Sequence, residues 1–303
     1  MNKITDYIKN PSMILAHFIR GKAKWMSDEM YLKIMYRANI GKKLNLKNPR
    51  TYTEKMQWLK LYDHKSIYTR MVDKYGVKGF VAERIGELYT VQTIGVFDSF
   101  EEIDFGTLPN KFVIKCTHDS HSILICRNKE TFDIEGARNR LNACLKENYF
   151  WKGREWPYRN VVPRIIIEKM LCEDPNDHLE EYDFFCFDGE PKIVCRCWGD
   201  RDRGEAHYND FYSIDGERLP FSWCYPTSED GKLVKDEIYH QMLSYSRSLS
   251  EGLPFLRVDF FRDENDRIYV GELTFYECSG LTKVHPPEWD EILGSWIQLP
   301  EIS

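Results

Sequence analysis

Two acidic residues on neighbouring apolar segments are the first candidates for chemistry. Asp259 falls within residues 256–261, Glu272 falls within residues 267–274, and a polar turn separates the two segments. A hairpin would bring both carboxylates into one cleft, where they would repel each other unless a cation lay between them. The sequence therefore predicts a metal site, and ligation by oxygen alone favours Mg²⁺ over zinc. The alternative is an ordinary hairpin with both acids in solvent.

A second candidate is the strongly charged segment between Cys195 and His207. It contains Arg201 and Arg203, whose planar guanidinium groups suit bidentate binding of a carboxylate or a phosphate. We expect this segment to be a loop. Its arginines are candidate ligands for a phosphate or an acceptor substrate, and a solvated loop without function is the alternative.

Composition limits the class of protein. The chain has 303 residues, of which 42% are hydrophobic and 30% are charged, and its net charge is -6. This is typical of a folded protein with a sizeable core, and it gives no overall basic field for nucleic acid. The apolar run at residues 13–19 is far shorter than the roughly 20 residues that span a bilayer. No cleavage site follows the run, so we expect no transmembrane segment, no export signal and a cytoplasmic location.

The nine cysteines include no Cys-x-x-Cys pair. We expect free, largely buried thiols in a reducing compartment rather than a disulfide framework. Cys195 and Cys197 would share one face of a strand, but the sequence shows no two further ligands for zinc.

The secondary structure expected to position these residues differs between regions of the chain. Apolar spacing predicts a helical region over residues 1–90, in which Thr51 or Thr53 could cap a helix. Alternating strands and helices then follow, with antiparallel hairpins, which favours an α+β fold. Helices are expected near residues 27–36, 52–59, 131–146 and 236–250, and strands near 90–96, 111–116, 123–125, 165–168, 184–187 and 193–197, before the acidic hairpin.

An ordered set of residues resembles the ATP-grasp superfamily, and within it the TupA-like branch. The set is Lys115, Glu168-Lys169-Met170-Leu171, Asp183, Arg257-Val258-Asp259 and Glu272-x-Thr274. Further segments similar to this branch are 48–55, 72–75, 154–158, 186–189 and 271–276. The resemblance implies an α+β ATP-grasp fold with a helical region at 1–90, a first subdomain at 91–165 and a second subdomain with the metal site at 166–303.

The resemblance also implies a nucleotide site. Lys115 would bind the α- and β-phosphates of ATP, and Lys74 could be a second lysine that reaches them. The loop that follows Lys115 contains no glycine, so the hydroxyls of Ser120 and Ser122 would have to assist its backbone. His118 in the same loop is either a phosphate donor or an exposed loop histidine. For both lysines, a solvated surface position is the alternative.

The remaining nucleotide contacts fall on the next strand. Glu168 would bind the adenine amino group, Lys169 would contribute its backbone, and Leu171 would pack on or pair with the ring. Asp183 would accept hydrogen bonds from the ribose hydroxyls. A strand that ends in a solvated Glu-Lys pair is the alternative.

The acidic hairpin completes the implied site. Asp259 and Glu272 would hold Mg²⁺, while Thr274 stands where many relatives have asparagine. Arg257 would lie on the same face of the strand as Asp259 and neutralise charge on a transferring phosphoryl group. Lys283 would add a further cation near an acyl phosphate.

The resemblance implies an ATP-dependent ligase that joins a carboxylate to an amine. Its substrates would be a small-molecule carboxylate and amine, including a sugar or polysaccharide precursor, in the synthesis of a cell-surface polymer. One alternative is a glycosyltransferase that uses a sugar nucleotide, because Asp200-Arg201-Asp202 matches an Asp-x-Asp metal motif. A nucleotide-binding scaffold without catalysis is disfavoured, since both metal carboxylates are present. Trp151, Trp156 and Tyr158 could support a sugar ring, although packing is the simpler role.

Overall fold

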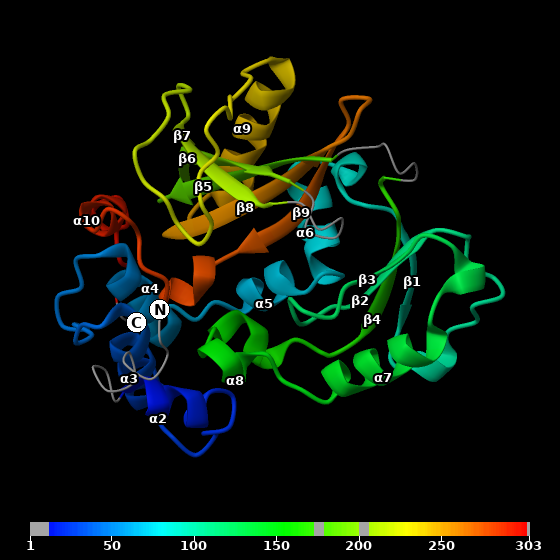
Figure 1. Ribbon diagram of the computed structural model, residues 1–303, viewed down its shortest axis with the longest axis horizontal. Helices are drawn as coiled ribbons and strands as arrows, with labels where there is room; N and C mark the ends of the chain where they lie inside the picture. Colours follow the sequence, from blue (N-terminus) through cyan, green and yellow to red (C-terminus); the bar gives the residue numbers. More distant parts are fainter. Residues whose placement is uncertain (1–11, 173–178, 200–205, 302–303) are drawn as a thin grey trace.

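The computed structural model describes residues 12–172, 179–199 and 206–301. Within them, two antiparallel sheets lie side by side with helices around them (Figure 1). The five-stranded sheet has the strand order β7-β6-β5-β8-β9, and the four-stranded sheet, called the lid sheet below, has the order β1-β4-β2-β3. This arrangement confirms the predicted α+β class.

The five-stranded sheet carries a different chemistry on each face. Its strands are β5 (Glu180–Phe187), β6 (Glu190–Trp198), β7 (Tyr208–Ser213), β8 (Phe255–Arg262) and β9 (Ile268–Thr274). Helix α9 (Glu237–Ser250) covers one face, where Phe184 contacts the ring of Tyr239. Because side chains alternate along a strand, Asp183 and its neighbours of odd number on β5 project to the other face.

The lid sheet consists of β1 (Thr93–Phe97), β2 (Phe112–Cys116), β3 (Leu124–Cys126) and β4 (Ile165–Lys169). Helix α7 (Ile134–Leu145) closes one face through Ala137 and Leu141, which belong to the same buried cluster as Ile114. Alternation directs Lys115 and Glu168 to the opposite face. The lid sheet therefore has an apolar face under α7 and a face that carries charged groups.

The helices before the lid sheet do not share one core. Helices α2 (Ser12–Ile19) and α3 (Asp28–Ile40) pack on each other in a small cluster. Helix α4 (Tyr52–Tyr62) instead contributes Met56 and Leu59 to the core of the five-stranded sheet. Thr51 caps α4 in a capping box with Glu54, which fulfils one of the two predicted caps.

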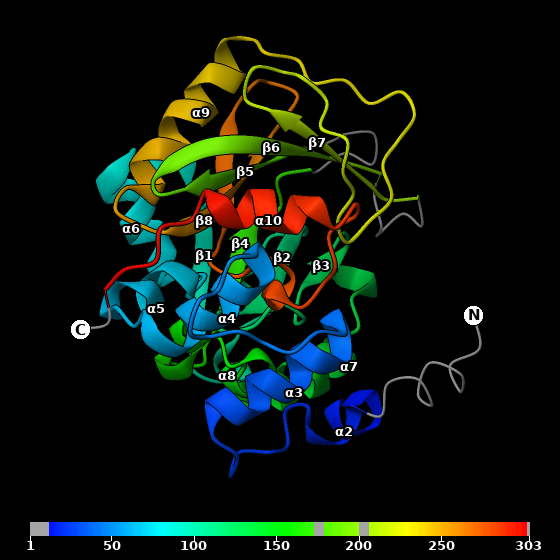
Figure 2. The same ribbon diagram turned by 90° about the vertical axis from the view of Figure 1, so that its left-hand side faces the viewer.

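Four further helices complete the structure within the described ranges. They are α5 (Ser66–Val72), α6 (Gly76–Arg84), α8 (Phe150–Gly153) and α10 (Glu288–Ser295). Helix α10 packs against α4, and both lie on the side of the five-stranded sheet opposite α9 (Figure 2). Short 3-10 turns occur at Glu87–Tyr89, Phe100–Glu102, Lys129–Thr131, Trp156–Asn160 and Glu277–Gly280. No helix in the described ranges is long and apolar enough to cross a membrane.

One expectation about the cysteines needs correction. Cys224 and Cys278 form a disulfide, because the chain brings the segment before α9 against the segment after β9. The other seven form no disulfide, and Cys116, Cys126, Cys186 and Cys195 among them are buried. The prediction of thiols without a disulfide is therefore confirmed for these seven and wrong for the bonded pair, whose separation of 54 residues gave no local signal.

Candidate active site

Three carboxylates form a row across the five-stranded sheet. Asp183 on β5 pairs with Asp259 on β8, and Asp259 pairs with Glu272 on β9. Residues directly opposite each other on antiparallel strands project to the same face. The hairpin therefore brings Asp259 and Glu272 together as the sequence predicts, and Asp183 joins them from a third strand.

A β-bulge sets the position of Glu272. Asp259 pairs with Glu272 while Phe260 pairs with Val270, so Gly271 is an extra residue on β9. A Cβ atom at Gly271 would lie 2.5 Å from the ring of Phe261, so a larger residue would displace this ring. Bulges re-aim side chains next to functional sites. Here the bulge keeps Glu272 opposite Asp259.

Arg257 lies among the carboxylates. Its Nε and Nη2 donate to Oδ1 and Oδ2 of Asp259 at 2.7 and 2.6 Å. Its Nη1 donates to Glu277, and its Nε lies 4.0 Å from Oδ2 of Asp183. The bidentate pair is the strong, directional form of an ion pair. Arg257 is consequently held in place before any ligand binds.

Burial makes this row costly to ionise. It raises the pKa of Asp259 to about 7, against the lowering effect of Arg257. Burial, together with the Asp259 charge, raises the pKa of Asp183 well above its usual range. A buried carboxylate loses hydration, and like charges nearby add to the penalty. The row therefore favours the binding of a further cation.

The oxygen atoms that remain available suit Mg²⁺. Thr274 Oγ1 and Asp183 Oδ1 are buried and have no hydrogen-bond partner among the described residues. Glu272 is half-buried and forms no hydrogen bond or ion pair within the described ranges. Asp259 can accept further bonds because a carboxylate offers about four lone-pair sites. Asp259, Glu272 and Thr274 thus fit a cation that prefers oxygen ligands.

The lid sheet presents a second ionic cluster. Glu168 Oε2 lies 2.6 Å from Lys115 Nζ, and Glu168 Oε1 lies 2.5 Å from Lys78 Nζ on α6. Although burial opposes it, the two ammonium groups lower the pKa of Glu168. The two lysines surround one carboxylate, so the cluster retains positive charge for an anionic ligand.

Lys74 joins the two clusters. It lies between α5 and α6, and its ammonium donates to the carbonyl oxygen of Asp119 in the loop after β2. Burial lowers its pKa, and the charges of Glu272 and Glu168 oppose that effect. Lys74 is therefore near a carboxylate of each sheet. A ligand between the sheets would meet cations from the lid and carboxylates from the five-stranded sheet, a combination suited to a metal-bound polyphosphate.

The other predicted lid residues have varied positions. Ser122 is buried, accepts a hydrogen bond from Cys116 N at 2.7 Å and donates to Asp119 at 2.5 Å. Ser120 is exposed and donates to Tyr149 at 2.8 Å. His118 is buried with Nε2 near the carbonyl oxygens of Cys144 and Glu147, both at 3.1 Å, and therefore does not occupy an exposed loop position.

The end of β4 completes the lid side. Glu168 is its last buried residue, Lys169 is exposed, and Leu171 is half-buried. The backbone N–H of Lys169 donates to Gln92 at 2.9 Å, which fixes the strand end.

Three predicted residues lie apart from this cluster or outside the description. Lys283 is exposed and lines a separate pocket next to the turn at Glu277–Gly280. Arg201, with Arg203 and the Asp200-Arg201-Asp202 motif, lies outside the described residues.

Sequence reasoning missed Lys78 of the lid cluster, and it missed two residues on the side of the carboxylate row. Glu277 pairs with Arg257 directly after β9. Lys60 on α4 is buried, and its ammonium donates to the carbonyl oxygen and the hydroxyl of Ser279, each at 2.7 Å. Cys278 and Ser279 have φ values of 47° and 56°, a left-handed conformation that costs about 1–3 kcal/mol per residue. Lys60 stabilises this turn, and no sequence pattern distinguishes it from a surface lysine.

The family comparison gives one clear match. Residues 54–298 match the family described as TupA-like ATPgrasp. This match covers more than half of the chain and includes every residue of the two ionic clusters. No curated protein matches the sequence.

Solved structures resemble parts of the chain at low identity. One is the ATP-grasp ligase PsnB complexed with a minimal precursor, with 10% identity and a TM-score of 0.38 over 69% of this chain and 53% of that one. Another is the D-alanine–D-alanine ligase of Bacillus anthracis, with 16% identity and a TM-score of 0.40 over 80% and 64%. A third is the ADP complex of purK, an N5-carboxyaminoimidazole ribonucleotide synthetase, with 14% identity and a TM-score of 0.44 over 82% and 57%. The chain thus spans less than two thirds of the length of each of these three proteins.

Proposed function

The chain belongs to the TupA-like ATP-grasp family, and from this premise we propose that it is an ATP-dependent ligase that joins a carboxylate to an amine. The observation that carries the proposal is the pairing of Arg257 with the carboxylate row, together with the cluster of Lys115 on the lid sheet and Lys78 on α6 around Glu168. The proposal assigns cations of this kind to phosphate and the oxygen atoms of the row to a metal.

We assign the nucleotide contacts as follows. Lys115 and Lys74 bind the phosphates, because both ammonium groups lie on the lid side of the site. The adenine binds at the end of β4. There Glu168 binds its amino group, Lys169 contributes its backbone, and Leu171 packs on or pairs with the ring. Asp183 accepts from the ribose, which is supported by its unpartnered Oδ1.

Mg²⁺ held by Asp259, Glu272 and Thr274 would neutralise charge on the phosphates. The protein's own residues provide the rest of the catalysis. Arg257 stabilises the charge that develops on the γ-phosphoryl group, and its pairing with Asp259 and Glu277 removes the cost of positioning it.

The reaction proceeds in two transfers. An oxygen of the substrate carboxylate attacks the γ-phosphorus, the bond to the β-phosphate oxygen breaks, and ADP leaves. The amine then attacks the carbonyl carbon of the acyl phosphate, inorganic phosphate leaves, and the nitrogen loses a proton. The products are an amide, ADP and phosphate.

The finer assignment rests on the family. We propose that the enzyme acts in the synthesis of a capsular or other cell-surface polymer. An amino acid or amino sugar would be joined to a uronic acid or a peptide-like chain. A cytoplasmic location follows from the need for ATP.

The test is a screen for ADP release with uronic acids, amino acids and short peptides, each with and without an amine. We expect ADP only when the correct carboxylate is present, and a hydroxamate when hydroxylamine replaces the amine. Glu272→Gln should strongly reduce both signals, while the matched Glu264→Gln in the exposed β8–β9 turn should not. Transfer of a sugar from a sugar nucleotide without ATP would instead support the glycosyltransferase alternative.

A further inference from the structure

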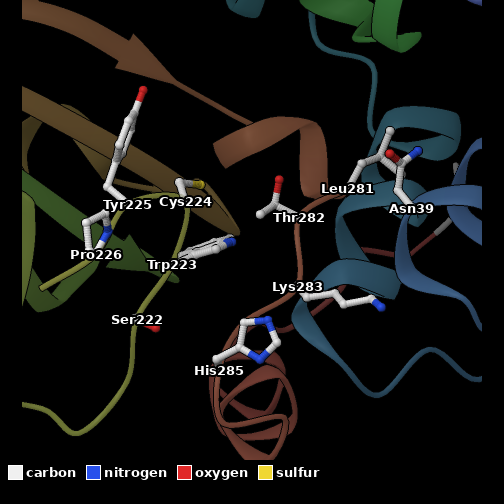
Figure 3. Close-up of a pocket in the computed structure, with 10 residues that line it drawn as sticks. All are labelled: Asn39, Ser222, Trp223, Cys224, Tyr225, Pro226, Leu281, Thr282, Lys283 and His285. Atoms are coloured by element: carbon white, nitrogen blue, oxygen red, sulfur yellow. The ribbon is translucent and has the colours of Figure 1, made fainter. Parts of the chain in front are cut away.

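A pocket of about 520 Å³ lies beside the turn at Glu277–Gly280. Small-molecule sites commonly have about 300–1,000 Å³. One wall is the loop at residues 222–226, the other includes Asn39, Leu281 and Lys283, and Thr282 and His285 lie between them (Figure 3).

Two connections hold the walls together. Ser222 and His285 exchange backbone hydrogen bonds, with N–O distances of 2.8 and 3.1 Å. The disulfide between Cys224 and Cys278 joins the same loop to the turn after β9. The pocket therefore exists before a ligand binds, which reduces the entropy lost on binding.

The pocket offers an unused hydrogen-bond donor. Trp223 is 2% exposed, and its Nε1–H is buried without a hydrogen-bond partner among the described residues. Figure 3 shows the indole nitrogen directed from the loop toward Thr282. A buried donor without a partner is unfavourable, and a hydrogen bond to a ligand oxygen would remove this penalty.

The side chains that line the pocket favour an anionic ligand over a cationic one. Lys283 is exposed and forms no ion pair within the described part of the chain, and Thr282 adds a hydroxyl. None of the described lining residues is an aspartate or a glutamate. A carboxylate on the ligand could pair with Lys283, whose flexible four-carbon stem lets its ammonium reach into the pocket.

The pocket adjoins the candidate active site. Cys224 Sγ in its wall lies 4.0 Å from Glu277 Oε1, and the other oxygen of Glu277 binds Arg257. Glu277 therefore links the wall of the pocket to the arginine that we assign to the γ-phosphoryl group.

We propose that this pocket binds the acidic substrate of the enzyme, a small hydroxylated carboxylate such as a sugar acid. Lys283 pairs with the carboxylate, while Trp223 Nε1–H and Thr282 donate to hydroxyl or ring oxygens. The role as substrate rests on the proposed ligase function, whereas binding itself does not require the nucleotide.

Saturation-transfer NMR and calorimetry without nucleotide test this proposal, with D-glucuronate as the probe. The neutral D-glucose is the matched control ligand, and L-glutamate is a carboxylate without the ring. We expect glucuronate to bind, glucose to bind at least tenfold more weakly, and glutamate to bind more weakly than glucuronate. Lys283→Met should weaken glucuronate binding at least tenfold, and Lys146→Met, at the exposed residue that follows α7, should leave it unchanged.

Trp223→Phe removes the donor and keeps most of the ring, and should weaken binding several-fold, because one hydrogen bond contributes about 1 kcal/mol. Because Trp223 is buried, thermal melting should first check that Trp223→Phe folds. If this variant does not fold, the exposed Lys283→Met variant alone tests the proposal. Equal binding of glucose, or glucuronate binding that survives Lys283→Met, would overturn the proposal. Equal binding of glutamate would overturn the assignment to a hydroxylated ring.

A parallel ATP-binding measurement separates this proposal from the ligase function. ATP should raise the melting temperature of Lys283→Met as it does that of the parent. Binding of ATP without any binding of glucuronate would overturn the pocket assignment alone. Lys283-dependent binding of glucuronate without any binding of ATP would support the pocket and contradict the proposed function.

Discussion

Arg257 and Asp259, two residues apart on one strand, form a bidentate ion pair with N–O distances of 2.7 and 2.6 Å. The pair couples a proposed metal ligand to the arginine proposed for the γ-phosphoryl group. A change at either residue therefore affects both the charge of the row and the position of the other side chain.

Removing the arginine should destabilise the protein. Arg257→Met leaves Asp259 and Glu277 without their cation, and breaking a buried ion pair costs about 3–5 kcal/mol. We expect a fall of this size in the free energy of unfolding, measured by urea denaturation. Adding Asp259→Asn to this variant should restore part of the loss. A double variant that is less stable than Arg257→Met would contradict the assigned pairing.

Lys115 should determine the affinity for ATP. Lys115→Met removes one charged phosphate contact, worth about 1.5–3 kcal/mol, so we expect roughly tenfold weaker binding or worse. Thermal shift measures this, because ATP with Mg²⁺ stabilises only the folded state to which it binds. Lys146→Met, exposed at the end of α7, is the control. The phosphate assignment fails if Lys115→Met binds ATP like the parent.

Glu272 should be needed for turnover but not for folding. Glu272→Gln keeps the shape of the side chain and removes one charge from the proposed metal ligands. Because a metal ion contributes several kcal/mol to charge stabilisation, turnover should fall on the order of 100-fold or more at limiting Mg²⁺. Steady-state ADP release across a Mg²⁺ titration is the measurement. An unchanged Mg²⁺ dependence would remove Glu272 from the site.

The sequence predicts the fold class and the regular elements well, because their signals are local. The alternating strands and the capped helix at Thr51 follow from side-chain periodicity and capping chemistry. The pairing of Asp259 with Glu272 also follows, since a short hairpin connects them. The proposed subdomain boundaries and ligand roles remain predictions.

The partners that determine the electrostatics were not predictable in the same way. Lys78 pairs with Glu168 across 90 positions of sequence, and Lys60 supports Ser279 across 219. Such contacts arise only when helices dock against the sheets. A lysine on an amphipathic helix otherwise indicates a solvent-exposed position.

Lys60 makes stability depend on pH. Burial lowers its pKa from 10.5 to about 8, so the unfolded chain binds more protons between these values. The free energy of unfolding attributable to Lys60 therefore rises as pH increases from about 8 to 10.5, by up to about 3 kcal/mol. Denaturation of the parent and of Lys60→Met across this range should show the difference. A difference that does not change with pH would contradict the lowered pKa.

The transfer of oxygen from the substrate carboxylate to phosphate tests the ligase account most directly. The carboxylate substrate identified in the ADP-release screen is labelled with ¹⁸O in its carboxyl group and supplied with ATP, Mg²⁺ and the amine. If an acyl phosphate forms, the attacking oxygen leaves with the phosphoryl group, and mass spectrometry should find one ¹⁸O atom in the inorganic phosphate for each amide made. Phosphate that contains no ¹⁸O, with the amide formed at the normal rate, would contradict the account.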